Sequence, residues 1–160
     1  GFGQSIAVTA LQLAMATSAA VNGGYLYTPH LVKRIEDENG VVREVYPEVR
    51  SRPISEETSK ELRKMLENVV ANGGGKNAYI EGYEVGGKTG TAQKFENGKI
   101  ARGKYVSSFV GFFPTSEPKY LALVVIDEPV GQSYGSIVAA PYAKLIFEKI
   151  IYLKDVRPRS

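Results

Sequence analysis

The segment from Gly86 to Gln93 is the part of this sequence best equipped for chemistry, because it combines one lysine and two threonines with several glycines. Lys88 supplies a positive charge, Thr89 and Thr91 supply hydroxyl donors, and the glycines let other groups approach the backbone closely. Such a segment can bind an anion. Two kinds of site use this combination: a loop that cradles the phosphates of a nucleotide, and a K-T-G strand that holds a peptide carboxylate beside an acyl-transfer site.

The phosphate-binding alternative matches the sequence from Gly82 to Thr89, which reads G-x-x-x-x-G-K-T. The apolar run that ends at Asp127 and Glu128 is also similar to the strand that holds magnesium in such proteins. A phosphate site, however, needs a helix that begins at the Lys-Thr pair, and the glycine and polar residues that follow give no helical period. We therefore favour the K-T-G strand and keep a P-loop-type nucleotide-binding protein as the alternative.

Two further motif matches are better explained as loops. Residues 131–135 read G-x-S-x-G, but the nucleophile elbow of an α/β-hydrolase needs a histidine after its serine, and the single histidine is His30. Residues 116–119 read S-x-x-K, but Pro118 lies in a short link between two predicted strands. No helical turn is expected there to bring Lys119 close to Ser116.

The composition is that of one ordinary globular domain, with 160 residues of which 43% are hydrophobic and 23% charged. The 20 basic and 17 acidic residues are scattered, so we expect no nucleic-acid-binding groove. The absence of cysteine excludes disulfides and a thiol nucleophile, and one histidine argues against a histidine-rich metal site or a Ser-His-Asp triad. We expect no metal or cofactor, and no segment is apolar enough for a membrane span.

Three helices are predicted from apolar periodicity and capping signals. The first covers 10–21, begins with a capping-box pattern of Thr9 and Gln12, and is apolar on nearly every side, so we expect it to be buried. The second should start near Ser55, and the third should cover 139–152. Apolar residues repeat along one face of the second helix: Leu62, Met65, Leu66, Val69 and Val70.

Strands are predicted where β-prone runs lie between turn signals, at 31–35, 41–46, 84–93, 105–113 and 120–126. The first two should form a hairpin, because Asn39-Gly40 can supply the positive φ angles of a tight turn. The later order of strand, strand, strand and helix with short links favours antiparallel pairing. We therefore predict an α+β fold, in which an antiparallel sheet is flanked by helices.

Several blocks of this sequence, in the expected order, resemble a known family. They are similar to the C-terminal half of the transpeptidase domain of class B high-molecular-weight penicillin-binding proteins, and they span nearly the whole chain. Ala10 stands where that family usually has proline. The blocks are Gly1–Ala14, Asn22–Gly24, Gly87–Ala92, Ser108–Pro114, Val124–Pro129 and Tyr134–Pro141.

The resemblance implies serine acyl transfer on a peptidoglycan stem peptide, with β-lactams acting as mimics of that peptide. By their places in the motif, Lys88 would attract the peptide carboxylate, and the hydroxyls of Thr89 and Thr91 would donate hydrogen bonds to it. The backbone amide of Thr91 would be one donor of the oxyanion hole, and Gly90 would leave room for substrate along the strand. Thr91 is thus the predicted catalytic residue, and residues 88–91 are the predicted substrate-binding residues. Without the resemblance, a surface lysine and ordinary strand threonines would be the simpler interpretation.

Two catalytic motifs of that family are missing from this sequence. The acylating serine of a helical S-x-x-K, and a second motif S-x-N, both lie upstream of K-T-G in the family. We therefore expect residues 1–160 to be the C-terminal portion of a transpeptidase domain, inactive by itself, from a serine-type D,D-transpeptidase. An apolar sheet face should then be left uncovered, and the missing N-terminal part of the domain, or a second copy, should fill that space.

The expected partners are the stem peptide, β-lactam antibiotics and the missing part of the same domain. The resemblance also implies a location on the periplasmic side of the cytoplasmic membrane, with the parent protein anchored by an N-terminal segment. Whether that parent serves division, elongation or sporulation stays open. A non-catalytic β-lactam or muropeptide sensor would share this fold, whereas a D,D-carboxypeptidase or β-lactamase fits the blocks after K-T-G less well.

Overall fold

A three-stranded antiparallel sheet forms the centre of the molecule, and the computed structural model describes residues 6–159. Its strands are β5 (Gly86–Glu96), β6 (Lys99–Phe113) and β7 (Tyr120–Asp127), in the spatial order β5-β6-β7. The three predicted strands are therefore confirmed, although β5 and β6 extend further into a long hairpin. The first five residues of the first resemblance block lie outside the described residues.

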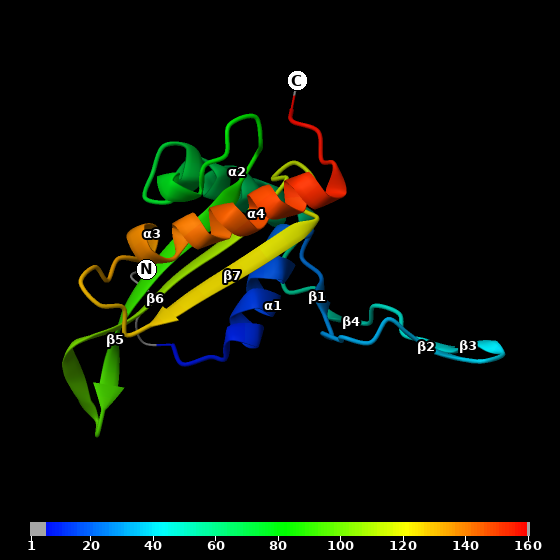
Figure 1. The fold of residues 1–160 in the computed structure, drawn as a ribbon, viewed down its shortest axis with the longest axis horizontal. Helices are drawn as coiled ribbons and strands as arrows, with labels where there is room; N and C mark the ends of the chain where they lie inside the picture. The colour runs from blue at the N-terminus through cyan, green and yellow to red at the C-terminus, as the bar shows by residue number, and fades with distance from the viewer. Residues whose placement is uncertain (1–5, 160) are drawn as a thin grey trace.

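Helices cover one side of this sheet and build the main core with it. Phe109 and Phe113, at alternate positions of β6, are fully buried and meet Phe147, whose ring lies 5.0 Å from that of Phe113. Val70 joins the same cluster. Figure 1 shows the last helix along this side and the first helix along the other. The elements that build this side are α2 (Glu56–Ala71), η1 (Lys76–Ala78), α3 (Gly135–Val138) and α4 (Ala140–Lys154).

The predicted starts of the second and third helices are confirmed within a residue or two. The hydroxyl of Ser55 accepts a hydrogen bond from the Thr58 amide at 3.1 Å and caps α2, as its sequence indicates. Met65 is 62% exposed, so its predicted place on the packed face of α2 is wrong. The other four predicted residues, Leu62, Leu66, Val69 and Val70, are half-buried or buried, so the covered surface of α2 is narrower than its apolar stripe.

Helix α1 (Ala10–Val21) has the predicted capping box, since the Gln12 amide donates to Thr9 Oγ1 and the Thr9 amide donates to Gln12 Oε1. The prediction that this helix is buried is wrong for this chain. Within it only Ala19 and Val21 are buried, and Leu11 is 58% exposed. A helix that is apolar all round needs neighbours on every side, whereas the main contacts of α1 are with α2, β1 and β7.

Residues 26–51 form a separate structure, here called the arm, which projects away from the central sheet (Figure 1). It contains β1 (Leu26–Tyr27) paired with β4 (Val49–Ser51), and β2 (Arg34–Asp37) paired with β3 (Gly40–Glu44). Pro29 and Pro47 lie between the two pairs, where their missing N–H groups interrupt the ladder. The predicted hairpin is therefore confirmed, with shorter strands than expected.

The turn of this hairpin differs from the prediction. Its central residues are Glu38 and Asn39, and Asn39 does not have a positive φ angle. Gly40 has φ +121° and pairs with Asp37, whose carboxylate accepts a hydrogen bond from the Asn39 amide at 2.8 Å. This side-chain bond holds the turn one residue earlier than the Asn-Gly pair predicts.

Candidate functional site

Lys88 and Thr89 lie well inside strand β5, where they pair with Val110 and Phe109 of β6. No helix begins at this lysine. A P-loop binds phosphate through the free amides at the start of a helix, so the nucleotide-binding alternative is wrong. The K-T-G segment is extended, as the competing prediction requires, and β5 is an edge strand of its sheet.

The packing of Gly135 identifies which backbone groups of β5 face the open edge. A Cβ atom on Gly135 would lie 2.5 Å from the carbonyl oxygen of Gly90 and 2.3 Å from that of Ser108. The two carbonyl oxygens are thus within about 5 Å of each other. Such a short separation occurs when two opposite residues form a hydrogen-bonded antiparallel pair, whereas in a non-hydrogen-bonded pair the two carbonyls point away from each other. Gly90 is therefore bonded to β6, and by alternation Thr89 and Thr91 direct their amides and carbonyls to the open edge.

The side chains around this edge come from both faces of the sheet. Lys88 and Gly90 share the face on which α1 lies, and Thr89 and Thr91 share the face covered by α3 and α4. The Lys88 ammonium donates a hydrogen bond to the Thr89 carbonyl at 2.9 Å, which places it at the open edge. The Lys88 ammonium therefore lies at the open edge, and the side chains of Thr89 and Thr91 lie on the opposite face of β5.

Thr91 is held in place by the start of α3. The amide of Gly135 donates to Thr91 Oγ1 at 3.1 Å, and a hydroxyl that accepts one hydrogen bond can still donate its own hydrogen. Gly135 has no substitute here, because a side chain would collide with the two carbonyls described above. The sequence placed Gly135 in one of the blocks that resemble the family, but no role was predicted for it. Its position just before a predicted helix was the signal that could have indicated a role.

The glycine at position 87 is explained by close packing, as predicted. A Cβ atom there would lie 2.7 Å from the carbonyl oxygen of Val110 and 2.4 Å from the ring of Phe109. Gly90 is different, since its nearest obstacle would be the hydroxyl of Ser108 at 2.6 Å, on a side chain that can rotate. Packing thus requires Gly87, whereas the expected reason for Gly90, room for substrate, stays a prediction.

Comparison with known proteins agrees with this arrangement. The profile of the family described as penicillin binding protein transpeptidase domain matches residues 1–151. The chain belongs to this family. The family and the α+β fold predicted from the sequence are both confirmed.

Curated relatives are much longer than this chain. Stage V sporulation protein D of Bacillus subtilis strain 168 is 45% identical over 162 residues, which cover 99% of this chain and 25% of that protein. The probable peptidoglycan D,D-transpeptidase PenA of Neisseria gonorrhoeae is 34% identical over 98% of this chain and 26% of its own length. The chain therefore spans about a quarter of these two relatives.

Solved structures share the fold over nearly the whole chain. Apo penicillin-binding protein 3 of Mycobacterium tuberculosis superposes with a TM-score of 0.86 at 27% identity, covering 99% of this chain and 38% of that one. The transpeptidase domain of penicillin-binding protein 3 from Burkholderia pseudomallei gives 0.78 at 34% identity, covering 96% and 44%.

The other motif matches of this transpeptidase-family chain are loops, as expected. Residues 114–119 join β6 to β7 without a helical turn, and Lys119 pairs with Glu117 rather than with Ser116. The G-x-S-x-G residues lead from β7 into α3, and the carbonyl of Ser133 accepts a hydrogen bond from the Ser107 hydroxyl. Neither serine is placed as a nucleophile.

A charged cluster that sequence reasoning missed lies where β5 leaves the sheet. Lys94 contacts Asp127 at 3.0 Å and Glu128 at 2.8 Å, and Lys104 contacts Glu96 at 2.6 Å. Hydrogen bonds to Glu128 and Asp127 raise the pKa of the Lys94 ammonium, and the hydrogen bond to Glu96 raises that of Lys104. The register shifts at this point, so the cluster braces a bend between the sheet and the hairpin tip.

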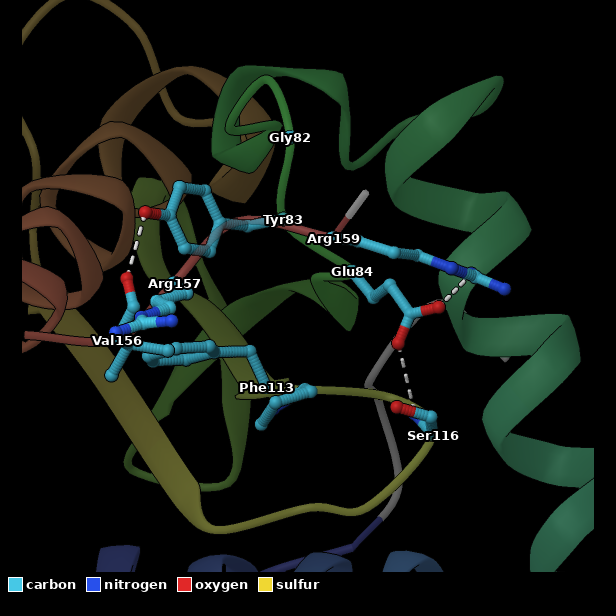
Figure 2. A pocket seen from close by; sticks show the side chains of 9 residues that line it. Gly82, Tyr83, Glu84, Phe113, Ser116, Val156, Arg157 and Arg159 are labelled. Atoms are coloured by element: carbon cyan, nitrogen blue, oxygen red, sulfur yellow. Dashed lines mark hydrogen bonds and ion pairs between the residues drawn. The ribbon is translucent and has the colours of Figure 1, made fainter.

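Two hollows lie elsewhere on the molecule, and neither is lined by residues 88–91. Figure 2 shows the smaller, of about 240 Å³, where the C-terminal tail crosses the start of β5. There Arg159 pairs with Glu84, and the Tyr83 hydroxyl donates to the Val156 carbonyl at 3.0 Å. These contacts fasten the tail, so this hollow has a structural explanation. The larger hollow, of about 510 Å³, is mostly apolar and lies between α1, the arm and α2.

Residues 6–159 contain no group of side chains that could hold a metal ion. Over the same range, no helix has the length and apolar character needed to cross a membrane.

Proposed function

We propose that this chain supplies the substrate-binding edge of a peptidoglycan D,D-transpeptidase, which cross-links stem peptides by serine acyl transfer. The observation that carries this proposal is the open edge of β5, with the Lys88 ammonium lying beside outward-facing backbone groups. An extended peptide can pair with such an edge as an added strand. No cofactor is needed for this chemistry.

The carboxylate of the stem peptide binds near Lys88. A fixed cation favours an anionic chain end, and the hydroxyls of Thr89 and Thr91 approach the same edge from the opposite face of the sheet. Charge and hydroxyl donors thus flank the peptide terminus, which orients it along the strand. Gly90, between the threonines, leaves that path clear.

Thr91 contributes to catalysis through its backbone amide. This N–H points to the open edge and serves as one donor of the oxyanion hole, where the substrate carbonyl becomes negatively charged. A serine from the upstream part of the domain attacks that carbonyl carbon, and the terminal D-alanine leaves. An amine of a second stem peptide then displaces the serine and forms the cross-link.

The upstream part of the transpeptidase domain, which carries the S-x-x-K and S-x-N motifs, packs against this chain. Two observations support this: α1 is apolar on nearly every side yet only two of its residues are buried, and the larger hollow beside it is lined mostly by apolar residues. A full domain buries such surfaces. We therefore infer that residues 1–160 are the C-terminal portion of the domain and are inactive by themselves.

β-Lactams are proposed to bind at the same edge as carboxylate-bearing mimics of the stem peptide. The structure of penicillin-binding protein 3 from Mycobacterium tuberculosis has been solved in complex with ampicillin and with aztreonam, and its fold matches this chain. Because the substrate lies outside the cytoplasmic membrane, we place the parent protein on the periplasmic side, anchored by an upstream segment.

Labelling with a fluorescent penicillin tests the proposal. The complete protein, with its upstream residues, is expected to be labelled covalently on an upstream serine, and residues 1–160 alone are not. In the complete protein, Lys88→Ala should lower the acylation rate about 10²-fold, since it removes a charged donor from the site. Lys99→Ala, an exposed lysine at the hairpin tip, is the matched control and should leave the rate unchanged.

Three results contradict the proposal. They are acylation of Lys88→Ala within twofold of wild type, covalent label within residues 1–160, and reversible penicillin binding without any covalent product. The last of these would instead indicate a non-catalytic sensor.

A further inference from the structure

The β2–β3 hairpin of the arm is unusually exposed. Every residue of both strands is exposed, and Figure 1 shows the hairpin reaching away from the rest of the molecule. Ile35 is 47% exposed and Val42 is 64% exposed. A lone two-stranded hairpin is marginal in water, and each of its outer edges offers unpaired backbone groups. A further strand on one edge would stabilise it.

The outward-facing residues of β2 can be identified. The Lys33 carbonyl accepts a hydrogen bond from the Val45 amide at 2.9 Å, and Asp37 pairs with Gly40 across the turn. Both residues therefore direct their backbone groups toward β3. The register shift adds its extra residue to β3, so alternation along β2 is unbroken. It follows that Ile35 also faces inward, and that the backbone groups of Arg34 and Glu36 face the outer edge.

The sequence of this strand is self-complementary in charge. Residues 33–37 read Lys-Arg-Ile-Glu-Asp, with two bases, one apolar residue and two acids. In antiparallel pairing with an identical strand about Ile35, Lys33 opposes the partner's Asp37 and Arg34 opposes the partner's Glu36. Ile35 then opposes the partner's Ile35 at the two-fold axis.

This register also satisfies the backbone. When two β2 strands pair antiparallel, residues whose backbone groups face outward must oppose each other, because they form the hydrogen-bonded pairs. Residues whose backbone groups face inward must likewise oppose each other. Arg34 and Glu36 are both outward, whereas Lys33, Ile35 and Asp37 are all inward. Charge and hydrogen-bond geometry, which are independent requirements, therefore select the same alignment.

We propose that a second copy of this chain pairs with the outer edge of β2, giving a four-stranded antiparallel sheet in the order β3-β2-β2-β3. Such an isologous contact closes on itself and leads to a dimer rather than a fibre. It goes beyond the proposed transpeptidase activity and does not depend on it. In the single chain Arg34 pairs with Glu36 at 2.7 Å, and in the dimer each exchanges that partner for its equivalent in the other copy.

The outer edge of β3 is less suitable. Its residues Val41 to Glu44 have no mirrored charge order, and the extra residue at the bulge disturbs the regular spacing that a new strand needs. The proposed contact is short, so it belongs with weak, concentration-dependent interfaces. Because it contains several exposed ion pairs, salt should weaken it.

Disulfide trapping tests the geometry directly, since the wild-type chain has no cysteine. In Ile35→Cys the two Cα atoms should lie about 4.5 Å apart across the two-fold axis, within the range that a disulfide spans. Mild oxidation should therefore give a covalent dimer. Val42→Cys is the matched control, because it is similarly exposed on the other strand and should cross-link much more slowly. Equal cross-linking rates for the two variants would overturn the proposal.

Charge reversal tests the register. Sedimentation velocity should give a dimer Kd for the wild-type chain that rises in 1 M NaCl. Arg34→Glu should raise that Kd at least about tenfold, because like charges then face each other twice in the dimer. Arg34→Glu combined with Glu36→Arg restores opposite charges and should return the Kd to within about threefold of wild type.

Arg43→Glu, with the same change in charge on β3, serves as the control and should alter the Kd less than about threefold. Amide NMR spectra of each variant verify that the hairpin is still formed. A folded double variant that fails to recover the dimer, or a wild-type chain that stays monomeric at about 1 mM, overturns pairing with a second copy. Either result would leave β2 as an edge for a different protein.

Discussion

Two hairpins in this molecule contain an Asn-Gly pair at the turn, and they use it differently. In β5–β6, Asn97 and Gly98 are the central residues and both have positive φ angles, +51° and +75°. In β2–β3, Gly40 has a positive φ angle and Asn39 does not. The first hairpin begins in a sheet that is packed on aromatic side chains, whereas the second stands alone in solvent.

The difference teaches that a turn sequence permits a hairpin without fixing its register. In β5–β6 the register is fixed by burial, because a shift of one residue would move Phe109 from the core to the opposite face. In β2–β3 both faces are exposed, so a local contact, the Asp37 carboxylate on the Asn39 amide, is enough to select the turn. Exposure also leaves the second hairpin open to a partner.

The largest expected effect is on the free energy of unfolding, because one hairpin has buried side chains and the other does not. Phe109→Ala should lower the free energy of unfolding by about 3–5 kcal/mol, because it leaves a cavity against Phe147. Ile35→Ala, in the exposed hairpin, should cost less than about 0.5 kcal/mol. Urea denaturation of both variants measures the contrast. Equal losses would mean that the arm is part of the cooperative core.

The next effect concerns close packing within β5. Gly87→Ala should cost about 1–3 kcal/mol, since its new methyl group meets the Phe109 ring and the Val110 carbonyl. Gly74→Ala is the control, because a Cβ atom there has no neighbour within 4 Å and its φ angle is not in the left-handed region. Thermal unfolding of the two proteins should differ clearly, and similar melting temperatures would contradict the packing argument.

A smaller effect sharpens the comparison of the turns themselves. Asn97→Ala places alanine at φ +51° and should cost about 1 kcal/mol, whereas Asn39→Ala avoids the left-handed region and should cost less than half of that. Amide hydrogen exchange at each turn reports the local cost. If the two substitutions loosen their turns equally, the two turns have the same geometry in solution.

The smallest effect is electrostatic and lies at the bend beyond Gln93. Lys94→Gln should speed amide exchange over residues 95–104, and high salt should reduce the difference from wild type, because the contacts are exposed. The pKa of Lys94 is raised above 10.5, so its contribution is complete below pH 10.5 and is lost as the pH rises through the raised value. As the pH rises through this value, amide exchange over residues 95–104 in the wild-type protein should therefore approach the rates measured in the variant. Unchanged exchange in the variant would show that the cluster does not brace the bend.

Local patterns predicted most of the elements. The capping box at Thr9, the cap at Ser55 and the alternation along β6 each act over a few residues, so the sequence indicates them directly. The exposure of α1 could not be predicted in this way, because it depends on which elements pack around the helix. The predicted burial of Met65 was wrong for the same reason, because the apolar stripe on α2 is wider than the surface that covers it.

The candidate site, too, was only partly predictable from the sequence. The sequence by itself determined that a lysine and two threonines lie on one extended segment, and that residues 33–37 carry mirrored charges, because both are properties of neighbouring residues. Only the tertiary structure decided that β5 is an edge strand, that Lys88 and Thr91 reach this edge from opposite faces, and that Gly135 closes onto Thr91. Those relations depend on contacts between separate elements, such as that of Gly135 with Thr91, and they arise when burial of the aromatic core fixes the strands against the helices.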